Sequence, residues 1–132
     1  MKNVKQIFRM LLPDSQQDLA VTANEAATFI LSYGNLKVAT LSLKDGLWKF
    51  VYSAAFKVQN EVKPLTEFSD VDKVYTSTML WTFFTIRIPS VKRPAVQRKI
   101  KEQSINKDSF VDMLKNFGKR TIANPYELNY LN

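Results

Sequence analysis

The residue types that most often carry out chemistry in proteins are rare or absent in this sequence. Its 132 residues include no histidine and no cysteine. This removes the commonest general base, the commonest metal ligand and the thiolate nucleophile. The carboxylates that lie closest together, in a polar stretch without metal-ligand spacing, are Glu67, Asp70 and Asp72. Carboxylates in such a stretch are typical of solvated loop charge rather than of a pKa-tuned acid–base pair.

Phosphate-binding and nucleophile motifs are also missing. A phosphate loop needs several glycines within a few residues, but the glycines of this chain are widely separated, at Gly34, Gly46 and Gly118. A nucleophile elbow needs a serine flanked by glycines, and no serine here has such neighbours. We therefore predict that the chain is not an enzyme and has no catalytic, cofactor-binding or metal site.

Positive charge is the strongest chemical signal that the sequence contains. The formal net charge is +7, and the segment 87–120 is rich in Lys and Arg, opposed only by Glu102, Asp108 and Asp112. Such an excess favours an acidic partner, which could be nucleic acid, a membrane surface or an acidic protein face. The alternative is a solvated helix face, because exposed helix positions are commonly charged.

Trp81 is a further candidate for a binding surface. It lies about 100° around its predicted helix from Leu80, so we expect it beside the apolar stripe and partly exposed. Partly exposed tryptophans are enriched at interface hot spots, although packing at the edge of the core would also explain its position. The candidate partner-binding residues are Trp81, Arg87, Lys92, Arg93, Arg98 and Lys101.

The elements that would position these residues begin with strands. Apolar alternation predicts three of them, over 28–33, 36–43 and 47–52. Gly34-Asn35 and Asp45-Gly46 lie between them, and both pairs tolerate the positive φ angles of two-residue hairpins. Because side chains alternate along a strand, one face of the third strand carries Trp48, Phe50 and Tyr52. The pattern predicts an antiparallel meander.

Helical spacing follows in the second half of the chain. One predicted helix begins at a cap on Ser77 or Thr78 and ends near Arg87, with a buried stripe of Met79, Leu80, Phe83 and Phe84. A second helix begins at Pro94, where a missing N–H costs nothing, and ends near Gln103.

A third helix and a closing strand complete the predicted domain. The helix runs from Lys107 to Phe117, with Asn106 as its cap and Gly118 as a left-handed stop. Apolar alternation in the tail 121–132 predicts one more strand. We therefore predict an α+β fold, a small antiparallel meander or partly closed sheet of three strands plus a C-terminal strand, packed with about three α-helices.

Residues 1–27 are predicted to lie outside this domain, which would span residues 28–132. A short amphipathic helix is expected up to Leu12, with apolar positions at Val4, Ile7, Phe8 and Leu11. Residues 14–27 are polar and are expected to form a tether. The sequence has neither a secretory signal nor the run of ~18–20 apolar residues that crosses a bilayer. We expect a cytoplasmic protein without membrane insertion.

The order of these pieces resembles the N-terminal domain of HipA-type serine/threonine kinases. The likeness covers roughly residues 29–131 and depends on order and spacing rather than on one motif. The matching stretches are Val38-Ala39-Thr40-Leu41, Asp45-Gly46, Phe50-Val51-Tyr52, Lys63-Pro64-Leu65, the run Leu80-Trp81-Thr82-Phe83-Phe84-Thr85-Ile86-Arg87-Ile88-Pro89, and Asp112-Met113-Leu114-Lys115-Asn116-Phe117-Gly118.

The sequence also departs from that family. Ala123-Asn124-Pro125 stands where the family usually has a small-residue turn, and residues 1–27 have no counterpart. The chain ends at Asn132, where a family kinase would continue into its ATP-binding and catalytic parts, and the family's catalytic-loop histidine is missing. The resemblance thus implies a free-standing N-terminal domain without the catalytic machinery.

Such a domain is similar to the small HipS-type component of split HipBST toxin–antitoxin systems. There the kinase is a separate, shortened chain, a HipB-like chain binds DNA, and the small protein counteracts the kinase. The resemblance therefore implies a non-catalytic, antitoxin-like partner of a HipA-like Ser/Thr kinase, in a system that can include a DNA-binding HipB-like protein. Two alternatives stay open: a basic nucleic-acid-binding accessory protein, and a structural subunit that completes the kinase.

Overall fold

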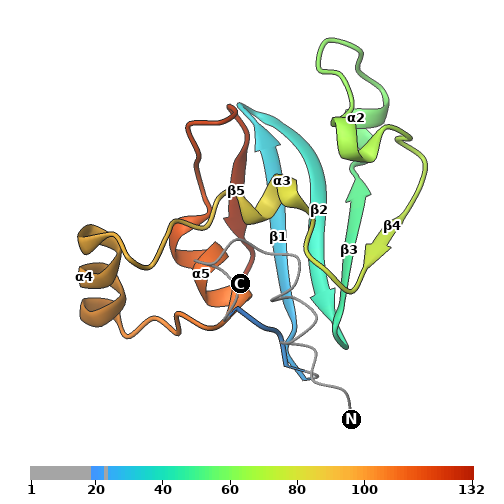
Figure 1. Cartoon of the computed structure of the whole chain (residues 1–132). Helices are drawn as coiled ribbons and strands as arrows, with labels where there is room; N and C mark the ends of the chain where they lie inside the picture. The colour runs from blue at the N-terminus through green and yellow to red at the C-terminus, as the bar shows by residue number, and fades with distance from the viewer. Residues whose placement is uncertain (1–18, 23) are drawn as a thin grey trace.

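The computed structural model describes residues 19–22 and 24–132, which form an open five-stranded antiparallel sheet with helices packed on it (Figure 1). The strand order is β4-β3-β2-β1-β5. The strands are β1 (Ala27–Tyr33), β2 (Leu36–Lys44), β3 (Leu47–Tyr52), β4 (Tyr75–Ser77) and β5 (Glu127–Tyr130). The predicted α+β class is confirmed, and β4 is a strand that the sequence did not predict.

Both predicted hairpins are present. Asp45 and Gly46 have φ angles of 52° and 75°, the two positive angles of a type I′ turn, whose twist matches that of the flanking strands. In the first hairpin Gly34 has φ 56°, as the first central position of a type II′ turn requires. These turns set the register in which Leu41 of β2 lies between Phe29 of β1 and Phe50 of β3.

One face of the sheet carries the core. Alternate residues of the three central strands are buried there, including Phe29, Leu31, Leu41, Leu43, Trp48, Phe50 and Tyr52. Helices α3 (Thr82–Thr85) and α5 (Phe110–Phe117) cover this face. The ring of Phe84 in α3 lies 6.0 Å from that of Phe50. The ring of Phe110 in α5 lies 6.5 Å from that of Trp48.

Two further α-helices and a 3₁₀ turn complete the described chain: α2 (Ala54–Lys57), η2 (Thr66–Phe68) and α4 (Pro94–Gln103). Helix α4 begins at Pro94 and ends at Gln103, both as predicted, and Ser104 caps it with the left-handed φ of 52°. It lies to one side, beyond the edge of the sheet at β5 (Figure 1). Its only fully buried residue is Val96, so most of its surface faces outward.

The predicted helix from Ser77 or Thr78 to Arg87 is wrong in its extent. Ser77 belongs to β4, where it pairs with Trp48 of β3, and its hydroxyl accepts a hydrogen bond from the N–H of Met79 at 3.0 Å. This local side-chain bond holds a bend, which competes with helix formation. The helix therefore begins only at Thr82, after Trp81, and ends at Thr85.

The predicted cap and stop of α5 are also wrong. Ser109, not Asn106, caps the helix, because its hydroxyl accepts a hydrogen bond from the N–H of Asp112 at 3.1 Å. Gly118 has φ −88°, outside the left-handed region. A Cβ on Gly118 would lie 2.7 Å from the carbonyl oxygen of Leu114, so this position favours glycine because of space rather than backbone angle.

Residues 19–22 pack against the domain, which differs from the tether predicted for 14–27. The Leu19 side chain is 2% exposed and belongs to the core. Ala20 pairs with the start of α5, since its N–H donates to the carbonyl of Asp108 at 2.9 Å and its carbonyl accepts from the N–H of Phe110 at 3.3 Å. The helix predicted up to Leu12 lies outside the described residues.

A helix that crosses a membrane must be both long and predominantly apolar. Within residues 19–22 and 24–132, no helix combines the necessary length with the necessary apolar character.

Tyr52 fastens the long connection between β3 and β4 to the sheet. Its hydroxyl donates to the carbonyl of Phe68 at 2.6 Å and accepts from the N–H of Leu65 at 2.9 Å. Burial raises the pKa of Tyr52 to about 12, because the charged phenolate is poorly solvated there. The neutral hydroxyl is therefore the form that supports the fold.

Tyr52→Phe is expected to lower the free energy of unfolding by about 2 kcal/mol, since it leaves two buried backbone groups without their partner. The raised pKa also predicts a pH dependence. The folded protein holds the phenolic proton more tightly than the unfolded chain, so this stability is complete below about pH 10 and falls as the pH rises toward 12. Urea denaturation at pH 7, 10 and 11 would measure both effects, and the variant should lose less stability than the wild type above pH 10.

Candidate partner-binding surface

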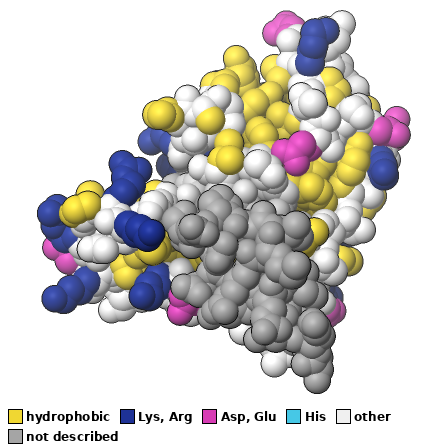
Figure 2. Space-filling model, in the orientation of Figure 1, with side chains coloured by type: hydrophobic (Ala, Val, Ile, Leu, Met, Phe, Trp, Pro, Cys, Tyr) yellow, Lys and Arg dark blue, Asp and Glu magenta, His cyan; other side chains and the backbone are white. Residues whose placement is uncertain are grey.

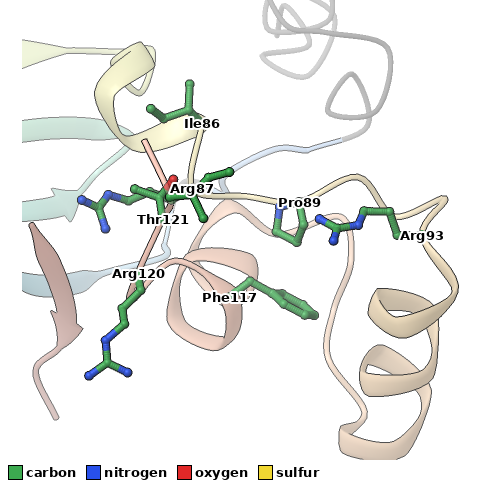
Figure 3. A pocket seen from close by; sticks show the side chains of 8 residues that line it. Ile86, Arg87, Pro89, Arg93, Phe117, Arg120 and Thr121 are labelled. Carbon is green, nitrogen blue, oxygen red and sulfur yellow. The ribbon is translucent and has the colours of Figure 1, made fainter. Parts of the chain in front are cut away.

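A hollow of about 600 Å³ opens between the end of α3, the start of α4 and the connection from α5 to β5. Figure 3 shows the side chains around it. Those of the described chain are aliphatic, aromatic and cationic, with one hydroxyl and no carboxylate. The lining residues are Ile86, Arg87, Pro89, Arg93, Phe117, Arg120, Thr121 and Ile122.

Two isoleucine side chains at the hollow are exposed to solvent. Ile86 follows the last turn of α3 and is 48% exposed, and Ile122 is fully exposed. A short turn presents Ile122, because Thr121 and Asn124 form a β-bridge and the hydroxyl of Thr121 accepts a hydrogen bond from the N–H of Ala123 at 3.2 Å. Single exposed apolar side chains are common, but two beside one hollow are typical of a contact surface.

Arg93 is an exposed cation in the lining of this hollow. It immediately precedes α4, and Pro94 fixes the start of that helix. In Figure 3 its side chain extends toward Pro89, and the ring of Phe117 lies below the two. No ion pair joins Arg93 to a carboxylate of the described chain. Its charge is thus free to meet an anion.

Arg120 is the second exposed cation of the lining, and it is paired. Its guanidinium lies 2.9 Å from the Glu127 carboxylate, and its side chain is 71% exposed. Exposed ion pairs of this kind contribute only about 0–1 kcal/mol. An incoming carboxylate could therefore compete for Arg120 at little cost.

Arg87 is different, because it is a structural residue and is only 3% exposed. Its guanidinium donates to the carbonyls of Gly118, Lys119 and Tyr126 and to the side-chain oxygen of Asn124, at 2.9–3.2 Å. Burial lowers the pKa of Arg87 to about 10, so the group is still charged at neutral pH. The predicted partner-binding role of Arg87 does not fit this burial, and we leave it out of the surface.

Trp81 also packs mainly within its own domain. It is half-buried, and its ring meets that of Phe68 edge-on at a centroid distance of 5.0 Å. This agrees with the edge-of-core alternative for Trp81. It does not line the hollow.

The other predicted partner-binding residues are exposed on or beside α4. Lys92, Arg98 and Lys101 all face solvent, and Lys and Arg side chains gather over this part of the molecule (Figure 2). They do not line the hollow. The basic stretch therefore divides into the buried Arg87, Arg93 at the hollow and a solvated face of α4.

The described lining residues offer cations, apolar surface and the Thr121 hydroxyl, and none of them is a usual general base near neutral pH. Across the described ranges, no group of three or more acidic side chains is placed to hold a metal ion. Sequence reasoning missed Ile86, Phe117 and Ile122, because nothing in their local pattern shows that they lie beside one another.

Comparison with known proteins adds no relative. No protein-family model matches the chain, and no curated protein matches it. A functional interpretation therefore depends on the residues and the geometry described above.

Proposed function

We propose that this chain is a non-catalytic binding partner of a separate HipA-like serine/threonine kinase and regulates it as an antitoxin-like protein in the cytoplasm. The observation that carries the proposal is the hollow beside Arg93. It has two exposed isoleucines at its margin, and none of the described residues that line it is a carboxylate. Such a surface fits another protein better than it fits a small substrate.

The architecture supports the same proposal. The stretches that resemble the HipA N-terminal domain, taken in their order along the sequence, fold into one α+β domain with its own sheet and core. A domain related to one that packs on a kinase would keep a complementary face when it is a separate chain. The effect on the kinase could take either sign, inhibition or completion of the kinase fold.

Co-expression with the HipA-like kinase expected beside its gene tests the proposal. We expect the two chains to elute together from size-exclusion chromatography, because an apolar hollow and an unpaired cation offer contacts that survive dilution. Kinase activity measured with and without the chain then gives the sign of its effect. Separate elution at micromolar concentrations, with unchanged kinase activity, would remove the proposed function.

One observation favours a second candidate, a nucleic-acid-binding accessory protein. Arg98 and Lys101 of α4 are exposed and make no ion pair with any carboxylate in the described part of the chain. Phosphate contacts by such residues would weaken steeply with salt, because counterions are released on binding. Salt-sensitive retention on duplex DNA, together with no binding to the kinase, would favour this candidate over the first.

A further inference from the structure

We infer that the hollow beside Arg93 binds a short acidic segment of a partner protein, in which an apolar side chain enters the hollow and a neighbouring carboxylate meets Arg93. The inference depends on the proposed function for the identity of the partner. The chemistry of the segment follows from the lining itself.

The apolar part of the segment follows from the margin of the hollow. Ile86 and Ile122 are exposed, and Pro89 and the ring of Phe117 line the same hollow. Burying such surfaces removes apolar area from water, which favours association. Val58 offers a comparison, since it is 87% exposed and does not line this hollow. The concave shape, rather than exposure alone, marks Ile86 and Ile122 as a site.

The acidic part of the segment follows from the charges. Arg93 forms no ion pair within residues 19–22 and 24–132, and the pair between Arg120 and Glu127 is exposed and exchangeable. Lys92 and Lys119 are the exposed chain neighbours of these two arginines. A carboxylate would meet complementary charge at this surface, whereas a lysine-rich segment would be repelled.

Two other occupants are disfavoured by charge. Residues 1–12 of this chain contain Lys2, Lys5 and Arg9 and no acidic residue, so they would place cations beside Arg93. A second copy of the chain has a net charge of +7, and its approach would be opposed by the same repulsion. A separate acidic partner is the occupant that fits.

The wall of the hollow is already in place before a partner arrives. Four hydrogen bonds from Arg87 tie residues 118–126 to the end of α3, and the Thr121–Asn124 bridge fixes the turn that presents Ile122. Binding therefore does not require this connection to become ordered, which lowers its entropic cost.

A methyl NMR titration of the full chain tests the inference without the kinase. The isoleucine methyl groups are labelled, and the chain is titrated with a synthetic peptide Asp-Leu-Glu-Phe-Glu and with the same peptide carrying Lys in place of each acid. We expect the acidic peptide to shift the methyl signals of Ile86 and Ile122, and the effect to weaken with salt. Ile30, which lies on β1, serves as the internal reference and should not move.

Matched variants locate the contacts. Arg93→Glu and Ile122→Ser should each lower the affinity for the acidic peptide by about tenfold. Lys101→Glu changes the same charge on α4, and Val58→Ser removes a comparable exposed apolar side chain, so each should change the affinity by less than about twofold. All four positions are exposed, so these substitutions leave the core unchanged.

The outcomes separate this inference from the proposed function. If the acidic peptide leaves Ile86 and Ile122 unmoved at millimolar concentration, or moves them no more than the lysine peptide does, the inference is overturned. The same holds if duplex DNA moves them and the peptide does not. Because the titration contains no kinase, its failure leaves binding to the kinase intact. Conversely, a peptide that binds while the kinase does not would remove only the proposed function.

Discussion

Replacing Arg87 with methionine should lower the free energy of unfolding by about 3 kcal/mol. The guanidinium is the shared donor for four oxygens of the segment 118–126. Two of these oxygens keep another donor in the variant. The Lys119 carbonyl still accepts from the N–H of Leu128, and the Asn124 side-chain oxygen still accepts from the N–H of Tyr126. The carbonyls of Gly118 and Tyr126 lose the donor that Arg87 supplies, and an unsatisfied acceptor costs roughly 1–3 kcal/mol.

An opposing effect makes this prediction informative. Methionine also removes a buried charge, and the lowered pKa of Arg87 shows that burial disfavours that charge. Replacing buried charge by apolar side chains is neutral or stabilising in some proteins. Here we expect the unsatisfied carbonyls to prevail, because methionine offers no donor. Urea denaturation followed by circular dichroism decides between them, with the exposed Arg93→Met as control at less than about 0.5 kcal/mol. A loss below 1 kcal/mol for Arg87→Met would show that relief of the buried charge compensates.

The same substitution connects stability to the hollow. Arg87 joins the end of α3 to the connection that presents Ile122, so its loss should loosen one wall without touching Arg93. In a folded Arg87→Met variant we expect a broadened Ile122 methyl signal. Arg87→Lys keeps the charge but replaces the planar guanidinium, with its several N–H donors, by a single ammonium nitrogen. Its free energy of unfolding should therefore lie between those of Arg87→Met and the wild type.

The strands were predictable because their signals are local. Asp45-Gly46 specifies a tight turn by backbone angle alone, and the alternation of Trp48, Phe50 and Tyr52 specifies which face is buried. Pro94 marked the start of α4 for a similarly local reason. β4 was missed because its three residues are held in place by pairing with β3, which is a contact between distant parts of the chain.

The errors in the helices have a physical cause of the same kind. Met79, Leu80, Phe83 and Phe84 have helical spacing, but Ser77 is held by β3 and bonds to the N–H of Met79, so the first part of that pattern becomes a bend. In α5 the side chain of Ser109 provides the cap, although Asn106 was an equally good residue type for it. Residue type alone did not distinguish the two positions.

The candidate site was predictable only in part. Arg93 was named from the basic stretch, but Arg87 stood in the same stretch and is buried. Their sequence neighbourhoods do not separate them, because the acceptors of Arg87 lie 31–39 residues later in the chain. Ile122 lay in a tail interpreted as part of a closing strand, whereas the strand begins at Glu127. A site formed by residues that are far apart in the sequence cannot be recognised from local sequence patterns.

Phe68→Ala should destabilise the domain by about 3–4 kcal/mol. Phe68 is fully buried although it belongs to the short turn η2. Its ring stacks on that of Phe50 at 3.9 Å and meets the rings of Tyr75 and Trp81 edge-on at 5.1 and 5.0 Å. Truncation removes both the apolar area and these aromatic contacts, and it leaves a cavity beneath Trp81. Chemical denaturation would measure the loss.

Trp81 provides a second measurement, which distinguishes a local cavity from general loosening. Its indole N–H signal in the NMR spectrum should move in Phe68→Ala, since its edge-on neighbour is lost, while that of Trp48 should stay because Trp48 packs on Phe110 instead. Phe68→Leu keeps most of the volume and should cost less than about 1.5 kcal/mol. If Phe68→Ala cost no more than Phe68→Leu, the stack on Phe50 would not hold the long β3–β4 connection. If the Trp81 signal did not move, that tryptophan would owe its position to contacts other than Phe68, and its partial exposure would again make it a candidate for a partner surface.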